Sequence, residues 1–399
     1  MRIIEVRELT IPISRYADST IASGGLTTSL VAVITDVIRS GAPVVGYGFA
    51  SVGRFGQGGL IRERFAPRLI AADTLSDEAG NELDPLRAWS VMMQGEKPGG
   101  HGERCVAVGT LDMAIWDAAA KIADQPLYRY VSERLSPAGL STALLSPALL
   151  SQYALPPRVS VYAGGGYRYP KDDLRRLSDE IRYFTDLGFT RAKIKVGTDL
   201  DQDLARIDTA ASRLAGPSHL AVDAMNTYDL ANALRAARAF APLGLAWFED
   251  ICDPLDFETL SRVASIYGHP IAAGEALFSR AEARLLDLHG GLRQTQDILL
   301  FDPTHCYGLT HYYEMVIDMI GRGWPRTAFW PHGGHLFGLH VVAALHLGGA
   351  ELNPSAFAPF QAMPHELSIE DGMIDLPQAP GIGFELQDDT RRAFRQLLD

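Results

Sequence analysis

The second half of the chain alternates between short strand-like segments and helical patterns. From residue 158 onward each short apolar segment is followed by a loop and then by a helical pattern such as "DLANALRAARAFAPLG". The strand-like segments are "RVSVYAGG", "RAKIKVG", "HLAVDA", "LAWFED", "PIAAGEA", "ILLFDP" and "TAFWPHGG". Alternation of this kind builds parallel sheets, and so many short units favour a barrel over a doubly wound sheet. We therefore expect a barrel domain over residues 158–354.

The chain before this alternation has a different pattern. "MRIIEVRELTIPIS", "SLVAVITDVI" and "VVGYGFAS" are typical of three antiparallel strands, with a Gly-Ala-Pro turn at 41–43 between the last two. Helical patterns then fill 58–135, the clearest being "GERCVAVGTLDMAIWDAAAKIA". These patterns predict an α+β unit over 1–135. Residues 136–157, rich in Pro, Ser and Leu, are predicted to be a linker or an insertion.

The C-terminal tail leaves the alternation as well. "ELSIEDGMIDLP" contains an Asp-Gly turn between alternating apolar residues, which predicts a β-hairpin, and "GIGFEL" predicts another short strand. We expect this tail, residues 355–399, to return to the N-terminal meander. The capping domain would then be discontinuous, formed by 1–135 and 355–399.

Composition and charge exclude several classes of protein. The net charge of −12 and the lack of basic runs argue against a nucleic-acid partner. Three scattered cysteines make neither a disulfide framework nor a CxxC metal site, and they suit a reducing cytosol. The N-terminus lacks the features of a signal peptide, and the longest apolar run, Leu336–Leu347, is interrupted and predicts a buried helix. We expect a cytoplasmic protein without a membrane partner.

Ionisable residues recur at the ends of the predicted barrel strands. They follow one another at intervals of 26 to 30 residues, the length of one strand, loop and helix, and they are Lys195, Asp223, Glu249, Glu275, Asp302 and His332. The C-terminal ends of barrel strands form the face on which such folds place their active sites. Lys193 shares a face of its strand with Lys195, because side chains two apart point the same way. Both lysines are therefore predicted to point into a site.

The three carboxylates in the middle of this series predict a metal centre. Asp223, Glu249 and Glu275 would repel one another on one face unless a cation lay among them, and oxygen ligands in that number suit Mg²⁺. Strand-end acids can instead cap the helices that follow them, but three at equal spacing beside lysines and a histidine favour the metal.

The segment "PHGGHLFG" supplies two candidate histidines, His332 and His335. Their spacing and the glycines between them do not fit a helical zinc motif. Asp302, one strand earlier, is placed to hydrogen-bond an imidazole and fix its tautomer. We expect a catalytic His–Asp pair and prefer His332, because it lies nearer the strand end; His335 remains the alternative.

The motifs "KIK", "VDA", "FED", "GEA", "FDP" and "PHGGH", in this order and spacing, resemble the enolase superfamily in its mandelate-racemase-like branch. The resemblance covers essentially the whole chain. It implies an α/β fold with a modified (β/α)7β TIM-like barrel, an α+β capping domain, and Mg²⁺ as the cofactor. Within the branch, segments such as "GQGGLIRERFA" and "EKPGGHGER" look most like the D-tartrate dehydratases. Met225 and Ala276 stand where those enzymes carry asparagine.

The resemblance and the residues imply the same chemistry. Lys195 would remove the proton α to a carboxylate, its pKa being lowered by Lys193 and the metal, and Mg²⁺ would stabilise the enediolate. Lys193 is also a candidate ligand of the substrate carboxylate. His332, supported by Asp302, would then protonate a leaving β-hydroxyl, so that a tartrate or a related acid sugar becomes a 2-keto acid.

Two other functions remain open at this point. The same residues serve a racemase or epimerase, and Met225 leaves room for a non-catalytic member. The candidate residues for reading the substrate from the capping loops are Arg54 and Lys97. The partners we expect are a small hydroxy acid and further copies of the chain in a homo-oligomer.

Overall fold

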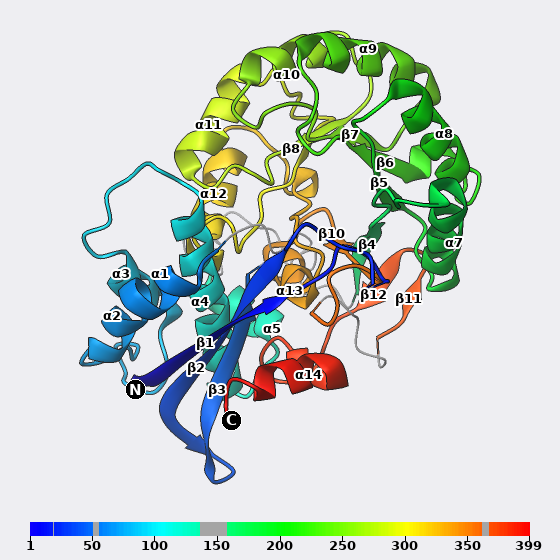
Figure 1. Cartoon of the computed structure of the whole chain (residues 1–399). Coiled ribbons are helices and arrows are strands. Elements are labelled where there is room, and N and C mark those ends of the chain that lie inside the picture. Colours follow the sequence, from blue (N-terminus) through cyan, green and yellow to red (C-terminus); the bar gives the residue numbers. More distant parts are fainter. Residues whose placement is uncertain (19, 51–55, 136–157, 361–366) are drawn as a thin grey trace, which may run out of the picture.

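A computed structural model describes residues 1–18, 20–50, 56–135, 158–360 and 367–399. Figure 1 shows a ring of alternating strands and helices in the upper part of the molecule and a twisted antiparallel sheet with flanking helices below it. The predicted linker 136–157 and Arg54 lie outside the described residues. The predicted fold class, a (β/α)7β barrel with an α+β capping region, is confirmed.

The N-terminal sheet is the predicted meander. Strands β1 (Ile3–Pro12), β2 (Thr27–Arg39) and β3 (Ala42–Phe49) pair in that order, all antiparallel. Short helices follow: α1 (Gly58–Leu60), a π-helical turn (Ile61–Phe65), α2 (Ala66–Ala71) and α3 (Pro85–Met93). Two longer helices, α4 (Glu103–Ile122) and α5 (Leu127–Arg134), complete the region.

Helix α4 lies between the meander and the barrel, and glycines make this position possible. A Cβ atom on Gly46 or Gly48 of β3 would lie 2.0 or 2.5 Å from a carbonyl oxygen of α4, so both residues must lack a side chain. On the opposite side, a Cβ on Gly109 of α4 would lie 1.8 Å from the carbonyl oxygen of Thr304 in the barrel. The helix is buried along most of its length for this reason.

The barrel follows the predicted alternation. Its first strand and helix are β4 (Arg158–Gly164) and α7 (Asp173–Asp186). The units that follow are β5 (Ala192–Lys195) with α8 (Leu200–Ala211), β6 (Leu220–Asp223) with α9 (Leu230–Phe240), β7 (Trp247–Glu249) with α10 (Phe257–Ala264), β8 (Ile271–Ala273) with α11 (Arg280–His289), and β9 (Ile298–Leu299) with α12 (Leu309–Gly321). Strands β4 to β9 pair in sequence order, all parallel.

The barrel is completed by the segment around Phe329 and by β10. Phe329 forms a parallel bridge with Leu299 of β9, and its carbonyl oxygen accepts a hydrogen bond from the backbone N–H of Gly348 just before β10 (Ala350–Leu352). Strand β10 in turn pairs in parallel with β4. Between the two lies α13 (Leu336–Leu345), the buried apolar helix expected from the sequence. Among the described residues, no helix is long and apolar enough to cross a bilayer.

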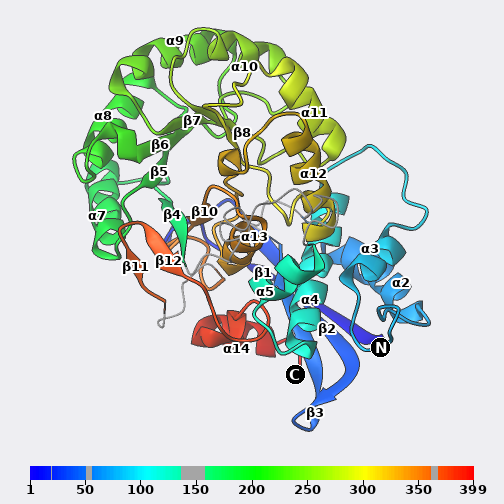
Figure 2. The same ribbon diagram turned by 180° about the vertical axis from the view of Figure 1, so that it is seen from behind.

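The tail does not behave as one unit. The predicted hairpin is present, as β11 (Ile369–Glu370) and β12 (Met373–Asp375), but its predicted docking is wrong: β12 pairs antiparallel with the barrel strand β4. "GIGFEL" contains a 3-10 turn at Phe384–Leu386 instead of the predicted strand. Other parts of the tail do return to the meander as expected: Phe384 packs against Phe49 of β3 at a ring distance of 5.4 Å, and Phe394 of α14 (Asp388–Arg395) packs against Tyr47 at 4.7 Å. Figure 2 shows the hairpin beside β4 and α14 below it.

Both backbone pairing and apolar contact hold the hairpin against β4. Ile374 of β12 lies opposite Val159, and Ile374 is fully buried. An unpaired edge of β4 would expose a row of backbone donors and acceptors, and the hairpin satisfies them. The domain boundaries at 135, 158 and 355 stay a prediction.

Candidate active site

The strand pairing of the barrel explains why evenly spaced residues meet. Lys195 of β5 lies beside Asp223 of β6, and Asp223 lies beside Glu249 of β7, in one continuous register. Each of these residues is the last of its strand. The C-terminal strand ends therefore bring together groups that are far apart in the sequence, as the spacing predicted.

Three buried carboxylates form the centre of the site. Oxygen atoms of Asp223, Glu249 and Glu275 lie within 4.8 Å of one another, and each residue is at most 4% exposed. Burial raises the pKa of Glu249 to about 7, although Lys193 acts in the opposite direction. Such a cluster is unfavourable when all its members are charged, and it offers hard oxygen ligands to a divalent cation. The donor set fits Mg²⁺.

The two lysines of β5 are both held by these acids. Nζ of Lys195 is 2.5 Å from Oδ2 of Asp223. Lys193 is fully buried and forms an ion pair with Glu249, while its Nζ is 3.3 Å from Oε1 of Glu351. The lysines point to the same side, as expected for residues two apart in a strand.

The predicted lowering of the lysine pKa is not found in the residues alone. Burial lowers the pKa of Lys195 and so does Lys193, but the charge of Asp223 outweighs both and raises it above its usual value. Lys193 thus lowers the pKa of Lys195, as predicted, but its effect is smaller than that of Asp223. Neutralising the charge of Asp223 is the condition under which Lys195 could become a base near neutral pH.

The histidine lies on the other side of the carboxylates. Nδ1 of His332 is 2.9 Å from Oδ2 of Asp302, and Nε2 is 3.3 Å from Oε2 of Glu275. The other oxygen of Asp302 accepts a hydrogen bond from the backbone N–H of Thr304 at 2.7 Å, which fixes the carboxylate. Burial lowers the pKa of His332, but Glu275 and Asp302 outweigh it and raise the pKa above its usual value.

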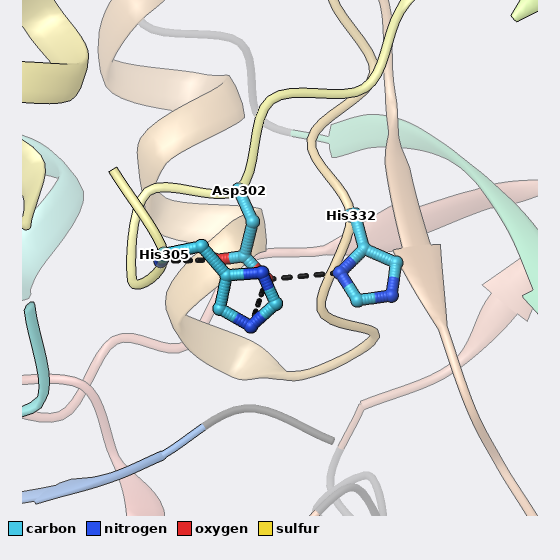
Figure 3. Close-up of side chains that lie close together, drawn as sticks. All are labelled: Asp302, His305 and His332. Carbon is cyan, nitrogen blue, oxygen red and sulfur yellow. Dashed lines mark hydrogen bonds and ion pairs between the residues drawn. The ribbon is translucent and has the colours of Figure 1, made fainter. Parts of the chain in front are cut away.

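A second imidazole that the sequence analysis missed lies on the same aspartate. Figure 3 shows Asp302 between His332 and His305, and Nε2 of His305 is 3.6 Å from Oδ2 of Asp302. His305 follows Asp302 by three residues, so the "DPTH" stretch carried a signal that could have found it.

His335 has different surroundings from His332. Its ring packs against Phe49 of the capping sheet, with centroids 5.0 Å apart, and neither of its nitrogens has a hydrogen-bond partner among the described residues. Burial lowers its pKa to about 4, so this imidazole is neutral. The geometry supports His332 as the acid and gives His335 a packing position.

A small cavity opens onto both proton-transfer candidates. It is lined by Arg15, Leu26, Tyr167, Lys195, Met225, Glu275, His332 and Phe357. Arg15 and Leu26 come from the connection between β1 and β2, so the capping region forms part of its wall. Lys97 is exposed on the segment between α3 and α4 and does not line this cavity. Arg15 and Tyr167 were not among the predicted residues.

Two further residues of the site are Met225 and Glu351. Met225 lines the cavity through its position after β6, and its backbone N–H donates to Asp223 at 2.7 Å. The neighbouring Asn226 donates its side-chain amide to Asp250 and so does not take the place of Met225. Glu351, the middle residue of the last barrel strand β10, was missed because its motif "AELNP" was not counted among the strand ends.

Comparisons with known proteins agree with this geometry. Arabinonate dehydratase of Saccharolobus solfataricus is 26% identical over 302 residues, covering 73% of this chain and 72% of the relative. L-talarate/galactarate dehydratase of Salmonella typhimurium is 26% identical over 368 residues, covering 91% and 82%. The crystal structure of a racemase from Streptomyces coelicolor with bound magnesium has a TM-score of 0.71 at 23% identity, covering 98% of both chains.

The family comparison is more direct. The model described as "Enolase C-terminal domain-like" matches residues 176–390, more than half of the chain, and this range includes the strand-end residues from Lys193 to Glu351. The resemblance found in the sequence motifs is confirmed: the chain belongs to the enolase superfamily.

Proposed function

We propose that this protein is a Mg²⁺-dependent hydro-lyase that removes water from a hydroxy acid of the acid-sugar class. The observation that carries the proposal is the pairing of two proton-transfer groups across one cavity, Lys195 on β5 and His332 after β9, with Asp223, Glu249 and Glu275 between them. Relatives named as acid-sugar dehydratases support the class of reaction. The neighbouring structure with magnesium supports the choice of cation.

The first half of the reaction belongs to Lys195. Its Nζ, neutral when the charge of Asp223 is offset, takes the proton α to the substrate carboxylate. Mg²⁺ held by Asp223, Glu249 and Glu275 would offset that charge and stabilise the negative charge that develops on the substrate. Lys193 remains buried between Glu249 and Glu351, where it keeps these acids in place; its contact with the substrate carboxylate stays a prediction.

The second half belongs to His332. Its Nδ1–H donates to Asp302, which fixes the tautomer and leaves Nε2 toward Glu275 and the cavity. A protonated Nε2 gives its proton to the leaving β-hydroxyl, so that one C–O bond breaks and water departs. The enol that remains takes up a proton at the β carbon and becomes a 2-keto acid. The departing water consists of the β-hydroxyl and the proton from His332, and the enol oxygen loses its proton as the β carbon gains one. Lys195 releases the α proton to solvent and His332 takes one up, so that the net change is the loss of one water.

The finer identity of the substrate is a tartrate or a related acid sugar. This choice rests on the sequence segments that resemble the tartrate dehydratases, "GQGGLIRERFA" and "EKPGGHGER". The test is to incubate the purified protein and Mg²⁺ with a panel of tartrates, aldonates and aldarates and to trap any 2-keto acid as its semicarbazone. Keto acid formed from at least one of them, and lost with EDTA, is the expected result.

Racemisation is the second candidate, because Lys195 and His332 line one cavity and either can reach a carbon placed between them. It predicts exchange of the α proton with deuterated solvent and inversion at that carbon without keto acid. A panel in which the α position exchanges and no semicarbazone forms would replace dehydration by racemisation. A protein that binds no Mg²⁺ in a titration would remove both.

A further inference from the structure

One cation of the cavity wall is not used by the proposed chemistry. Arg15, in the connection between β1 and β2, lines the cavity together with Lys195 and His332. It belongs to the capping region, whereas all groups of the proposed chemistry belong to the barrel. Arg15 therefore borders the cavity from the capping region, whereas Lys195 and His332 border it from the barrel.

The guanidinium of Arg15 is held in place without being neutralised. Within the described ranges it forms no ion pair with an aspartate or glutamate; one Nη donates to the carbonyl oxygen of Ser23 at 3.4 Å. Its Nε is buried and has no hydrogen-bond partner in the described part of the chain. A guanidinium has five N–H donors in a fixed fork, so most of them are left for a ligand.

The loop around Arg15 is itself ordered by short-range hydrogen bonds. The hydroxyls of Ser14 and Ser23 are 2.9 Å apart, and the backbone N–H of Arg15 donates to the hydroxyl of Ser23. These bonds close the loop at the base of the side chain. Arg15 is thus presented to the cavity by a fixed backbone, which reduces the entropy lost on binding.

Tyr167 connects this arginine to the catalytic lysine. The guanidinium carbon of Arg15 lies 5.6 Å from the centre of the Tyr167 ring, and Nζ of Lys195 lies 5.1 Å from the same centre. The two cations therefore flank one aromatic side chain. Lys195 is paired with Asp223 at the metal end, whereas Arg15 at the capping end has no acidic partner among the residues that the structure describes. The cavity offers an anionic substrate a second positive group away from the metal.

We propose that Arg15 binds a second carboxylate of the substrate, so that the site prefers dicarboxylic hydroxy acids over monocarboxylic ones. This inference rests on the proposed function, because it assumes that the first carboxylate lies at the metal end. A planar guanidinium with free donors recognises a carboxylate in a bidentate manner. A substrate with a hydroxymethyl group in that place leaves the buried Nε–H of Arg15 poorly satisfied, which is the arrangement that gives strong discrimination.

The experiment uses pairs of acids that differ only at the far carbon. Galactarate and galactonate share their carbon chain and hydroxyl configuration, and so do tartrate and threonate. We expect Arg15→Gln to lower kcat/KM for the diacid of the productive pair by roughly 100-fold, and to change the value for the monoacid by less than about threefold. Arg15→Lys should restore part of the loss, since it keeps the charge without the bidentate fork.

Arg176→Gln is the matched control. Arg176 also lies over a tyrosine ring, that of Tyr169 at 5.3 Å, and contacts the same loop through Asp18 at 3.5 Å, but it does not line the cavity. This variant should leave the preference for diacid over monoacid unchanged. It therefore separates loss of a ligand contact from general loosening of the capping loop.

Binding gives a readout that does not depend on turnover. Calorimetry with Mg²⁺ should show tighter binding of the diacid than of the matched monoacid, and Arg15→Gln should abolish that difference. Equal losses for both acids, or a wild-type preference for monoacids, would overturn the role of Arg15. A third outcome separates the two proposals. If the protein shows neither turnover nor proton exchange, but binds diacids more tightly in a way that depends on Arg15, the proposed function is rejected and the second carboxylate site is kept.

Discussion

Two groups of buried acids in this molecule differ in the partners of their carboxylates. Asp112 and Asp117 of α4 are fully buried, like Asp223, Glu249 and Glu275 at the strand ends. Asp112 accepts from the backbone N–H of Leu309 at 2.7 Å, and Asp117 accepts from those of Tyr47 and Ile382 at 2.9 and 2.7 Å. The strand-end acids instead face lysines, a histidine and one another.

The difference separates acids that join segments from acids that hold a ligand. The two aspartates of α4 fasten this helix to β3, to the start of α12 and to the tail, because each backbone donor they accept belongs to another element. Backbone donors are fixed, so these contacts are complete in the protein alone. Asp117 also pairs with Lys121. The three strand-end acids, however, lie within 4.8 Å of one another and share the ammonium groups of Lys193 and Lys195, so a further cation would reduce their repulsion. The second arrangement is typical of functional sites.

The largest effect should come from removing one charge of the strand-end group. Glu249→Gln should reduce turnover to background and weaken Mg²⁺ binding, because one of three oxygen ligands loses its charge. The circular dichroism spectrum should stay that of the wild type. Glu258→Gln, at an exposed acid in the first turn of α10, is the control. Full activity of Glu249→Gln would remove the metal assignment.

The next prediction distinguishes the roles of Lys195 and His332. Lys195→Ala should abolish both turnover and exchange of the α proton with deuterated solvent, a loss of at least about 10³-fold. His332→Asn should stop dehydration while some exchange remains, because Lys195 is still present and faces the same cavity. The measurements are keto-acid formation and loss of the α-proton resonance in deuterated buffer.

His335→Asn is the comparison for that pair. His335 packs on Phe49 and has no hydrogen-bond partner within the described ranges, so its loss should reduce stability more than turnover. An inactive His335→Asn enzyme beside a His332→Asn enzyme that dehydrates normally would reverse the assignment of the two histidines.

A smaller effect, on stability, should come from α4. Asp117→Asn should lower the free energy of unfolding by about 3 kcal/mol, because an amide has one acceptor oxygen and cannot satisfy two backbone donors and Lys121 together. Urea unfolding measures the change, and Asp208→Asn, at an exposed position of α8, is the control. A loss no larger than that of the control would contradict the joining role of Asp117.

The smallest effect concerns pH. Burial raises the pKa of Asp112 to about 7, above its unfolded value near 4. The folded protein therefore holds a proton that the unfolded chain has already released, and stability from this group is lost as pH rises from about 4 to about 7. Asp112→Asn should reduce the difference in unfolding free energy between pH 5 and pH 7 by about 2 kcal/mol. An unchanged difference would show that Asp112 is charged at pH 5.

The sequence predicted best what repeats. The barrel and its strand-end residues follow from alternation and from a constant interval, so Lys195, Asp223 and Glu249 could be placed side by side before any coordinates. Glu351 lies outside that series, because it is the middle residue of β10 and follows His332 by less than one repeat, and it was missed. His305 lies inside a loop, where no periodic signal exists.

Contacts between distant segments were the harder part. Arg15 reaches the cavity only because the β1–β2 connection folds over the barrel, and one sequence holds no pattern for that approach. The hairpin was predicted from its Asp-Gly turn, but its partner strand was not, because β4 and the meander both offered apolar edges. Local chemistry fixes a turn, whereas packing of the whole chain decides where it docks.

The position of the hairpin has a consequence for how the chain is made. Strand β4 begins at Arg158, yet both of its lateral partners other than β5 come from much later in the chain, β10 at Ala350 and β12 at Met373. During synthesis the edge of β4 stays unpaired until β10 and β12 have left the ribosome. Contacts of such long sequence separation slow folding and prolong exposure to aggregation. Closure of the barrel is therefore expected to be the last step of folding, and it takes place at β4, the barrel strand that is synthesised first.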